Sequence, residues 1–207
     1  MIKHNTPVLL SLVLLFGLVS CASSPKVTRV STDTAIDLSG YWNDTDVRTV
    51  ADSLIDKMEK AKQVTDFVSD YGRKNKGEHP TVIVGTFRNN SSEHINTQII
   101  ANMMRTSIIN GGVFAFVEGG KAREDIRAER EDQNAGNAAN SVGIGREAAA
   151  DFMLSGEVNS IVDSSGNQTV RSYFVKATLT NTETNRILWE GDNNEIKKVI
   201  VRPKIKL

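Results

Sequence analysis

The sequence has a single cysteine, Cys21, among its 207 residues, so no disulfide can form within the chain. It also lacks an excess of either charge, because 25 Lys and Arg residues balance 25 Asp and Glu residues. Nucleic-acid-binding proteins usually carry a basic surplus, and this balance argues against DNA or RNA as the main partner. The hydrophobic content of 39% is ordinary for a globular protein, and the length suits one domain with appendages.

Metal-ligating side chains are also few. The three histidines are His4, His79 and His94, and none of them forms a His–x₃–His pair. Cys21 is the only thiol, and the acidic stretch before Arg48 lacks the ligand spacing of a calcium loop. We therefore expect no metal and no cofactor.

Recognisable catalytic patterns are missing from the sequence. Gly119-Gly120-Lys121 lacks both the earlier glycine and the following Ser or Thr of a phosphate-binding loop. No Gly-x-Ser-x-Gly motif is present, and no pattern joins a nucleophile to a base and an orienting group. The sequence predicts that the protein is not an enzyme, with a cell-wall enzyme as a competing interpretation.

The apolar run at residues 8–19 is too short to span a membrane. As a helix it would rise about 18 Å, against a hydrocarbon core of about 30 Å. Lys3 and His4 precede the run and small residues end it, which is the pattern of a secretory signal. We expect residues 1–20 to be a signal peptide that is removed on export.

The end of this signal, Leu18-Val19-Ser20-Cys21, resembles the bacterial lipobox. That resemblance implies diacylglycerol on the Cys21 sulfur, cleavage before Cys21 and acylation of its new amine, which together make a stable anchor. Ala22 stands where an Asp retains lipoproteins in the inner membrane of well-studied bacteria, so the outer membrane is favoured. The alternative is an ordinary signal peptide with a chance cysteine.

The mature chain divides into a tether and one domain. Residues 21–39 are polar with small side chains and predict a lipidated tether, whereas residues 40–207 predict a single globular domain. The expected fold class is α/β (α+β), with a single mixed β-sheet flanked by helices.

The first part of the domain begins with a helix. Apolar residues at helical spacing predict this helix over 46–66, capped by Asp44 or Thr45, with a polar loop at 69–80 after it. β-Branched residues at 81–87 predict a buried central strand.

A second helix is expected after this strand. Asn90 and Glu93 have the spacing of a capping box, and Gly111-Gly112 stop the helix. Its predicted apolar face consists of Ile95, Ile99, Met103 and Thr106.

The remaining elements follow from composition and turn residues. They are a short strand at 113–117, a charged helix at 120–133, a loop at 134–145, a short helix at 146–150, and antiparallel strands near 152–162, 168–180 and 186–196.

Three arginines of the charged helix, Arg123, Arg127 and Arg130, are candidates for docking a partner, since arginine is favoured at interfaces. The simpler interpretation is a solvated face that pairs with itself, for example through Arg127 and Glu131. Three aromatic residues could also anchor a partner, but the simpler interpretation is that they belong to the core: Tyr41, Trp42 and Trp189. The basic C-terminal residues could touch an anionic surface, but the simpler interpretation is a solvated tail: Lys197, Lys198, Arg202, Lys204 and Lys206.

Several blocks of the sequence, in order after the lipobox, resemble the LpoB-like outer-membrane lipoproteins, which activate penicillin-binding proteins. The blocks that carry the resemblance are residues 39–46, 82–85, 89–97, 114–118, 130–133, 150–157 and 187–190.

This resemblance implies a mixed sheet similar to that of the TolB N-terminal domain, and no enzymatic activity. It also implies a partner, a bifunctional penicillin-binding protein (a peptidoglycan synthase), which the domain would reach from the outer membrane on its lipid anchor while facing the periplasm. Activation would be allosteric, through tighter binding to the active state of the synthase. Only residues 22–39 form the tether, about 60 Å when fully extended, which makes the reach short.

A structural or assembly outer-membrane lipoprotein, related to the CsgG-like secretion components, is the alternative. It would form ring-shaped oligomers with an amphipathic membrane hairpin. The sequence shows no pair of roughly ten-residue strands with a clean lipid-facing alternation.

Overall fold

A computed structural model describes residues 27–32 and 34–203. The chain divides into two compact units, Met1–Thr34 and Ala35–Leu207. The described residues of the first unit are exposed and form neither helix nor strand. The apolar run at 8–19, Cys21 and the last basic residues, Lys204 and Lys206, lie outside the described residues.

The second unit is built on one mixed sheet, which confirms the predicted fold class. The strands are β1 (Thr81–Asn89), β2 (Ala115–Phe116), β3 (Phe152–Ser165), β4 (Gln168–Asn181), β5 (Ile187–Asn193) and β6 (Lys197–Val201). Their order is β2-β1-β3-β4-β5, and β6 pairs with β4. The β1–β2 and β1–β3 pairs are parallel, and all pairs of β4 are antiparallel. The strand predicted at 81–87 is therefore central, as expected.

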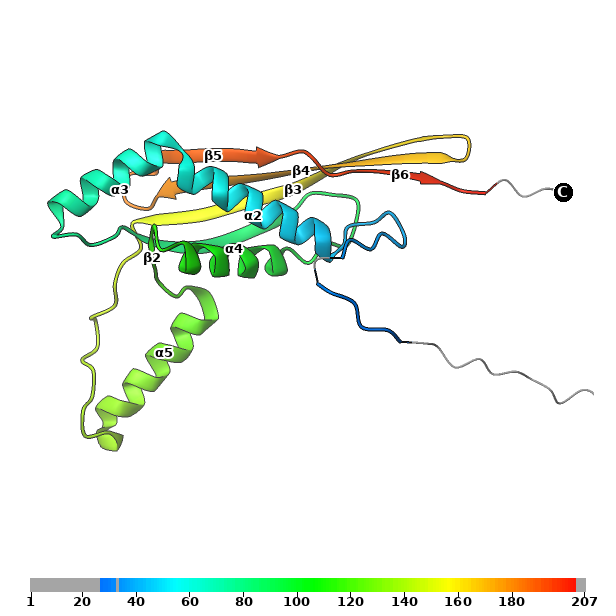
Figure 1. The fold of residues 1–207 in the computed structure, drawn as a ribbon. Coiled ribbons are helices and arrows are strands. Elements are labelled where there is room, and N and C mark those ends of the chain that lie inside the picture. Colours follow the sequence, from blue (N-terminus) through cyan, green and yellow to red (C-terminus); the bar gives the residue numbers. More distant parts are fainter. Residues whose placement is uncertain (1–26, 33, 204–207) are drawn as a thin grey trace, which may run out of the picture. The chain divides into compact units, whose positions relative to one another are not determined.

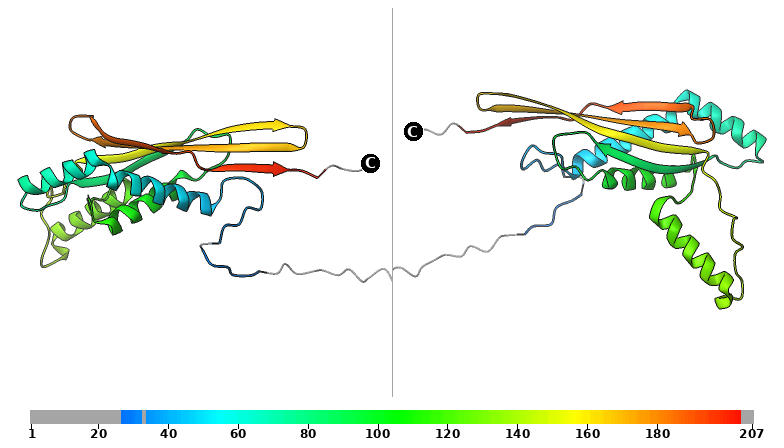
Figure 2. Two further views of the ribbon diagram at one scale, coloured as in Figure 1. Left: turned by 45° about the horizontal axis from the view of Figure 1, so that its top comes forward. Right: turned by 180° about the vertical axis from the view of Figure 1, so that it is seen from behind.

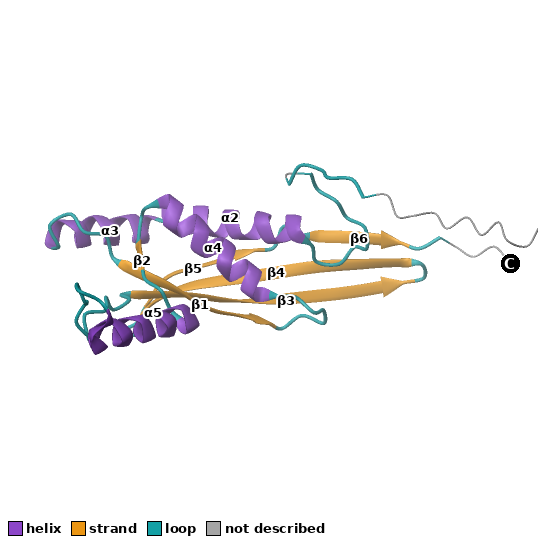
Figure 3. Ribbon diagram, turned by 90° about the horizontal axis from the view of Figure 1, so that it is seen from below, coloured by secondary structure: helices purple, strands orange, loops and turns teal. Residues whose placement is uncertain are grey.

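Helices α2 (Asp44–Lys60), α3 (Lys62–Lys74) and α4 (Thr97–Gly111) cover one face of this sheet (Figures 1 and 3). Alternate side chains of β3 and β4 point toward these helices and are buried, because side chains of a strand alternate between its faces. The core formed between the two layers includes Val50, Leu54, Met58, Val82, Ile100, Met104, Ile108, Phe152, Leu154, Tyr173, Val175, Leu179 and Trp189.

The first helix begins earlier than its apolar spacing suggests and breaks in the middle. Asn43 caps α2 in a capping box with Asp46, so the predicted caps Asp44 and Thr45 are wrong. Ala61 has an extended backbone with ψ 130°, which separates α2 from α3 and turns Val64 into the core. The polar loop predicted at 69–80 is therefore wrong up to Lys74, where packing overrides the low apolar content.

Helix α4 has a different cap and a different buried face from those predicted. The Asn96 side chain accepts from Gln98 N, whereas Glu93 is taken by other partners described below. Ile99 is 50% exposed. The buried residues of α4 are Ile100, Ala101, Met104 and Ile108. Of the predicted face, Ile95 just before the helix is buried and Met103 is half-buried against the core. The predicted stop is confirmed, because Gly112 has φ +68°, which suits glycine.

The short helix predicted at 146–150 is wrong, since this segment has no regular structure. Its carbonyl groups are bonded by side chains instead: Thr81 Oγ1 donates to Ala149 O and Thr182 Oγ1 to Ala150 O. The charged helix is confirmed as α5 (Gly120–Asp132), which a single π-turn, η2 (Gln133–Asn137), extends. Figures 1 and 2 show α5 projecting from the sheet on the same side as α4.

Strands β3 and β4 form a long hairpin that extends beyond β1 and β5. Gly166, with φ +59°, turns the hairpin, and β6 pairs with the distal part of β4 from Gln168 to Ser172. The prediction of a solvated basic tail is therefore wrong for Lys197 and Lys198, which belong to a sheet strand. Within the described residues, no helix is long and apolar enough to cross a membrane.

Candidate interaction surfaces

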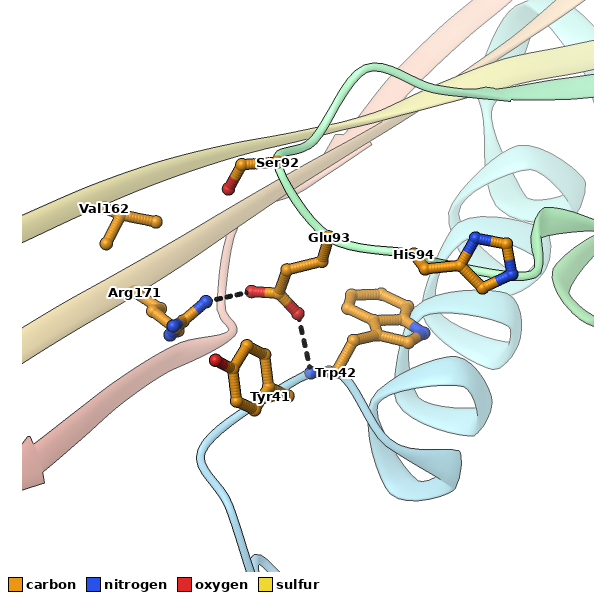
Figure 4. Close-up of a pocket in the computed structure, with 7 residues that line it drawn as sticks. All are labelled: Tyr41, Trp42, Ser92, Glu93, His94, Val162 and Arg171. Carbon is orange, nitrogen blue, oxygen red and sulfur yellow. Dashed lines mark hydrogen bonds and ion pairs between the residues drawn. The ribbon is translucent and has the colours of Figure 1, made fainter.

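A buried ion pair lies where the hairpin leaves the helices. Glu93, in the loop between β1 and α4, accepts a hydrogen bond from Arg171 of β4 at 2.5 Å (Figure 4). The same carboxylate oxygen accepts from the Tyr173 hydroxyl at 2.7 Å. The other oxygen of Glu93 accepts from Trp42 N at 3.2 Å. Only 7% of the Glu93 side chain and 13% of the Arg171 side chain are exposed. Removing either partner would therefore leave a buried charge.

Two aromatic residues from the segment before α2 cover this pair. The Arg171 guanidinium lies 4.0 Å from the Tyr41 ring centroid, and the Trp42 ring meets Tyr173 edge-on at 5.2 Å. Burial, and then the hydrogen bond to Glu93, raise the pKa of Tyr173, so its hydroxyl stays protonated and donates at neutral pH. Trp42 is half-buried and Tyr41 half-exposed, whereas Trp189 is a core residue.

An open pocket of about 510 Å³ lies over the pair, lined by the residues that Figure 4 labels. Ser92, Glu93 and His94 are consecutive here, but Glu93 bonds Arg171 and not His94. In the described residues the Ser92 hydroxyl and the His94 ring share no hydrogen bond, and Figure 4 shows the His94 ring turned away from both neighbours. The three side chains therefore lack the geometry of a nucleophile, base and orienting group.

A second network, buried at Lys198 and Asp46 and exposed at Asp37, joins the start of the domain to β6. Lys198 Nζ donates to Asp46 at 2.6 Å, to Asp37 at 2.6 Å and to Tyr41 O at 2.9 Å. Burial disfavours the ammonium form, but the hydrogen bonds to Asp37 and Asp46 outweigh it and raise the pKa of Lys198. Lys198 is 10% exposed, so the residue expected in a solvated tail instead fixes the segment that precedes α2.

The structure brings the three predicted docking residues together on one face of α5. Arg127 donates twice to Glu147, at 2.8 and 2.9 Å, while nitrogens of Arg130 and Arg123 lie 3.3 and 3.9 Å from the same carboxylate. The predicted pairing of Arg127 with Glu131 is wrong, because the acidic partner comes from the irregular segment before β3. Sequence reasoning missed Glu147, which it assigned to a short helix.

Other candidate residues stay apart from these clusters. His79 lies in the loop before β1, with Nδ1 3.1 Å from Val113 O. Across residues 27–32 and 34–203, no group of three His, Cys, Asp or Glu side chains is placed to hold a metal ion. Cys21, the predicted lipidation site, lies outside the described residues.

Comparison with known proteins gives one family match and several structural ones. The family model described as peptidoglycan-synthase activator LpoB matches residues 46–195. A search of the curated proteins gives no match.

Two of the similar solved structures are LpoB C-terminal domains, from Salmonella enterica and Escherichia coli. Each is 16% identical and covers 76% of this chain and 99% of its own, with TM-scores of 0.42 and 0.43. The NMR structure of E. coli LpoB is 14% identical over 98% of this chain and 89% of that one, with a TM-score of 0.40.

The family match begins inside α2 and ends just before β6, and so spans the two-layer core and α5. On that match, this chain belongs to the LpoB family of peptidoglycan-synthase activators.

Proposed function

We propose that this chain is a lipid-anchored regulator of peptidoglycan synthesis that docks on a bifunctional penicillin-binding protein and activates it. The observation that carries the proposal is the family match over residues 46–195. The family is one of activators and not of catalysts.

The anchor is the lipidated Cys21, which rests on the lipobox at Leu18–Cys21. Several acyl chains on one residue hold a protein stably in a bilayer. With Ala22 after the cysteine, the proposed location is the outer membrane, with the domain facing the periplasm.

The tether sets how far the domain reaches. Asp37 is bound to Lys198, so the chain from Asp37 onward is fixed to the domain, and the part of the predicted tether that sets the reach is Ala22–Ile36. Fully extended, that segment spans about 50 Å. The synthase must therefore project toward the outer membrane to meet the domain.

Activation is an equilibrium effect in this proposal. The domain binds the active state of the synthase more tightly than the resting state, and only that difference shifts the population. The docking face proposed here is the arginine face of α5, formed by Arg123, Arg127 and Arg130, because it is cationic and projects from the sheet.

The test is capture from membranes, with the full-length lipoprotein in detergent as bait and mass spectrometry as readout. Recovery of a bifunctional penicillin-binding protein supports the proposal. Recovery of secretion or outer-membrane components without any synthase contradicts it.

The second candidate function, an assembly lipoprotein related to CsgG-like secretion components, is favoured by the outer face of the long hairpin. Ile161, Val199 and Val201 there are 62, 55 and 64% exposed. Apolar groups gathered on one face can pair copies of a chain. Ring-shaped oligomers in mass photometry would favour this function, and a monomer would contradict it.

A further inference from the structure

Helix α5 is not held in its position by hydrophobic packing. Over Gly120–Asp132 no side chain is buried, and Ile126 is 41% exposed. A helix that is polar all round takes its orientation from polar contacts and not from packing. The contacts that hold α5 are Arg123 Nε on Glu118 O and the arginine face on Glu147.

The arginine face holds more positive charge than its partner neutralises. Three guanidinium groups share the Glu147 carboxylate, and only Arg127 binds it in the two-pronged geometry. Arg130 Nη1 lies 3.3 Å from Glu147 without a well-aligned hydrogen bond, and Arg123 Nη2 has no hydrogen-bond partner. The hydrogen bond from Arg127 holds the pKa of Glu147 below its usual range, so Glu147 is ionised at neutral pH. The face therefore has unused donors for a second carboxylate.

The segment that supplies Glu147 is loosely held. Residues 138–150 have no helix or strand and contain no buried side chain. Apart from the Glu147 ion pairs, this segment is joined to the helical segment by Asn134 Nδ2 of η2, which donates to Val142 O. A segment with little buried surface opens at low free-energy cost, so another acid can replace Glu147.

The space beside the carboxylate indicates what the replacing group looks like. A pocket of about 290 Å³ is lined by two arginines, two glutamates, an isoleucine and a glycine: Arg127, Arg130, Glu131, Glu147, Ile144 and Gly145. Ile144 is 71% exposed, so an apolar side chain stands next to the cationic one. An acidic residue with an apolar neighbour complements this pair of surfaces.

We infer that Glu147 occupies, in the free protein, the place that an acidic side chain of the synthase takes in the complex, an inference that rests on the proposed function. The ligand is an acidic segment with an apolar residue beside its carboxylate. Glu147 competes with it, which keeps the arginine face closed to weaker acids. The site therefore selects partners whose carboxylate binds at least as well as the internal one.

The experiment compares Glu147→Gln and Arg127→Glu with wild type in binding to the purified synthase, using the full-length lipoprotein in detergent at two salt concentrations. Removing the internal competitor strengthens binding by about two- to fivefold, the range of an exposed ion pair. Charge reversal at Arg127 weakens it at least as much, and both effects shrink at high salt. Matched controls are Glu190→Gln and Arg73→Glu, which change the same charges at exposed ion pairs elsewhere.

Two further probes separate this inference from the proposed function. A short synthetic peptide of alternating leucine and glutamate should bind Glu147→Gln more tightly than wild type. If it does so while no synthase binds, the proposed function fails, but competition between Glu147 and an external acid for the arginine face stands. Synthase binding that is equal in wild type, Glu147→Gln and Arg127→Glu overturns the inference and spares the proposed function. Loss of binding to phosphatidylglycerol vesicles in Arg127→Glu, with synthase binding intact, overturns it in favour of a lipid surface.

Discussion

Two glutamates of this protein each bind arginine, and their surroundings give them opposite roles. Glu93 lies between the sheet and the helices, 7% exposed, with one arginine, a tyrosine hydroxyl and a backbone N–H around it. Glu147 lies in the irregular segment before β3, and 25% of its side chain is exposed. Three arginines of α5 share its single carboxylate. A buried pair with matched donors fixes structure, whereas an exposed and unbalanced one is free to exchange partners.

The largest expected effect is on the buried pair. Glu93→Gln leaves the Arg171 charge without its counter-ion and should cost about 3 kcal/mol of unfolding free energy. Urea unfolding followed by circular dichroism measures it. A loss as small as that of Glu147→Gln would break the comparison between the two glutamates.

The Lys198 network should come next. Lys198→Met keeps the apolar stem but leaves Asp46 buried without its cation, at a cost of about 2 kcal/mol. Hydrogen exchange should also quicken in residues 37–43, because the substitution removes their bond to β6. Unchanged protection there would show that other contacts hold this segment.

Alkaline pH tests the hydroxyl that donates to Glu93. The pKa of Tyr173 is raised in the folded state, so its contribution to stability is complete below the unfolded value and falls as pH rises through the folded one. Stability should therefore drop above about pH 10. Tyr173→Phe should cost about 1 kcal/mol at neutral pH and flatten this alkaline decline. An equally steep decline in the variant would assign it to other groups.

The smallest expected effect on stability is that of removing the Glu147 charge beside α5. Glu147→Gln should leave the urea midpoint of the domain unchanged, because Glu147 is half-buried, lies outside the core and pairs only with arginines of α5. The same unfolding measurement applies, with Glu190→Gln as its control. A marked loss of stability would make Glu147 structural and remove the contrast with Glu93.

Local patterns predicted much of this fold. The long β3–β4 hairpin, the Gly112 stop and the charged helix follow from alternation, turn residues and spacing within short windows. The break at Ala61 and the strand β6 did not, because each depends on packing against distant residues.

The candidate interaction surfaces were likewise predicted in part, where the residues lie close together in sequence. Arg123, Arg127 and Arg130 were predicted as a docking set because they lie in one charged helix and arginine is favoured at interfaces. Their partner Glu147 was not, since a return segment without periodic pattern brings it back to α5. Glu93 resembled a cap residue in sequence, and its true partner Arg171 is far along the chain.

The proposed function of this protein is activation of a synthase. The direct measurement is the rate of glycan-strand synthesis from lipid-linked precursor by the purified bifunctional penicillin-binding protein of the same bacterium, with and without the full-length lipoprotein in detergent. If the protein activates the synthase, the rate rises and saturates as wild-type protein is added. The Arg127→Glu variant should reach the same rate only at higher protein concentrations. A rate that stays constant although the two proteins bind would contradict the proposed function.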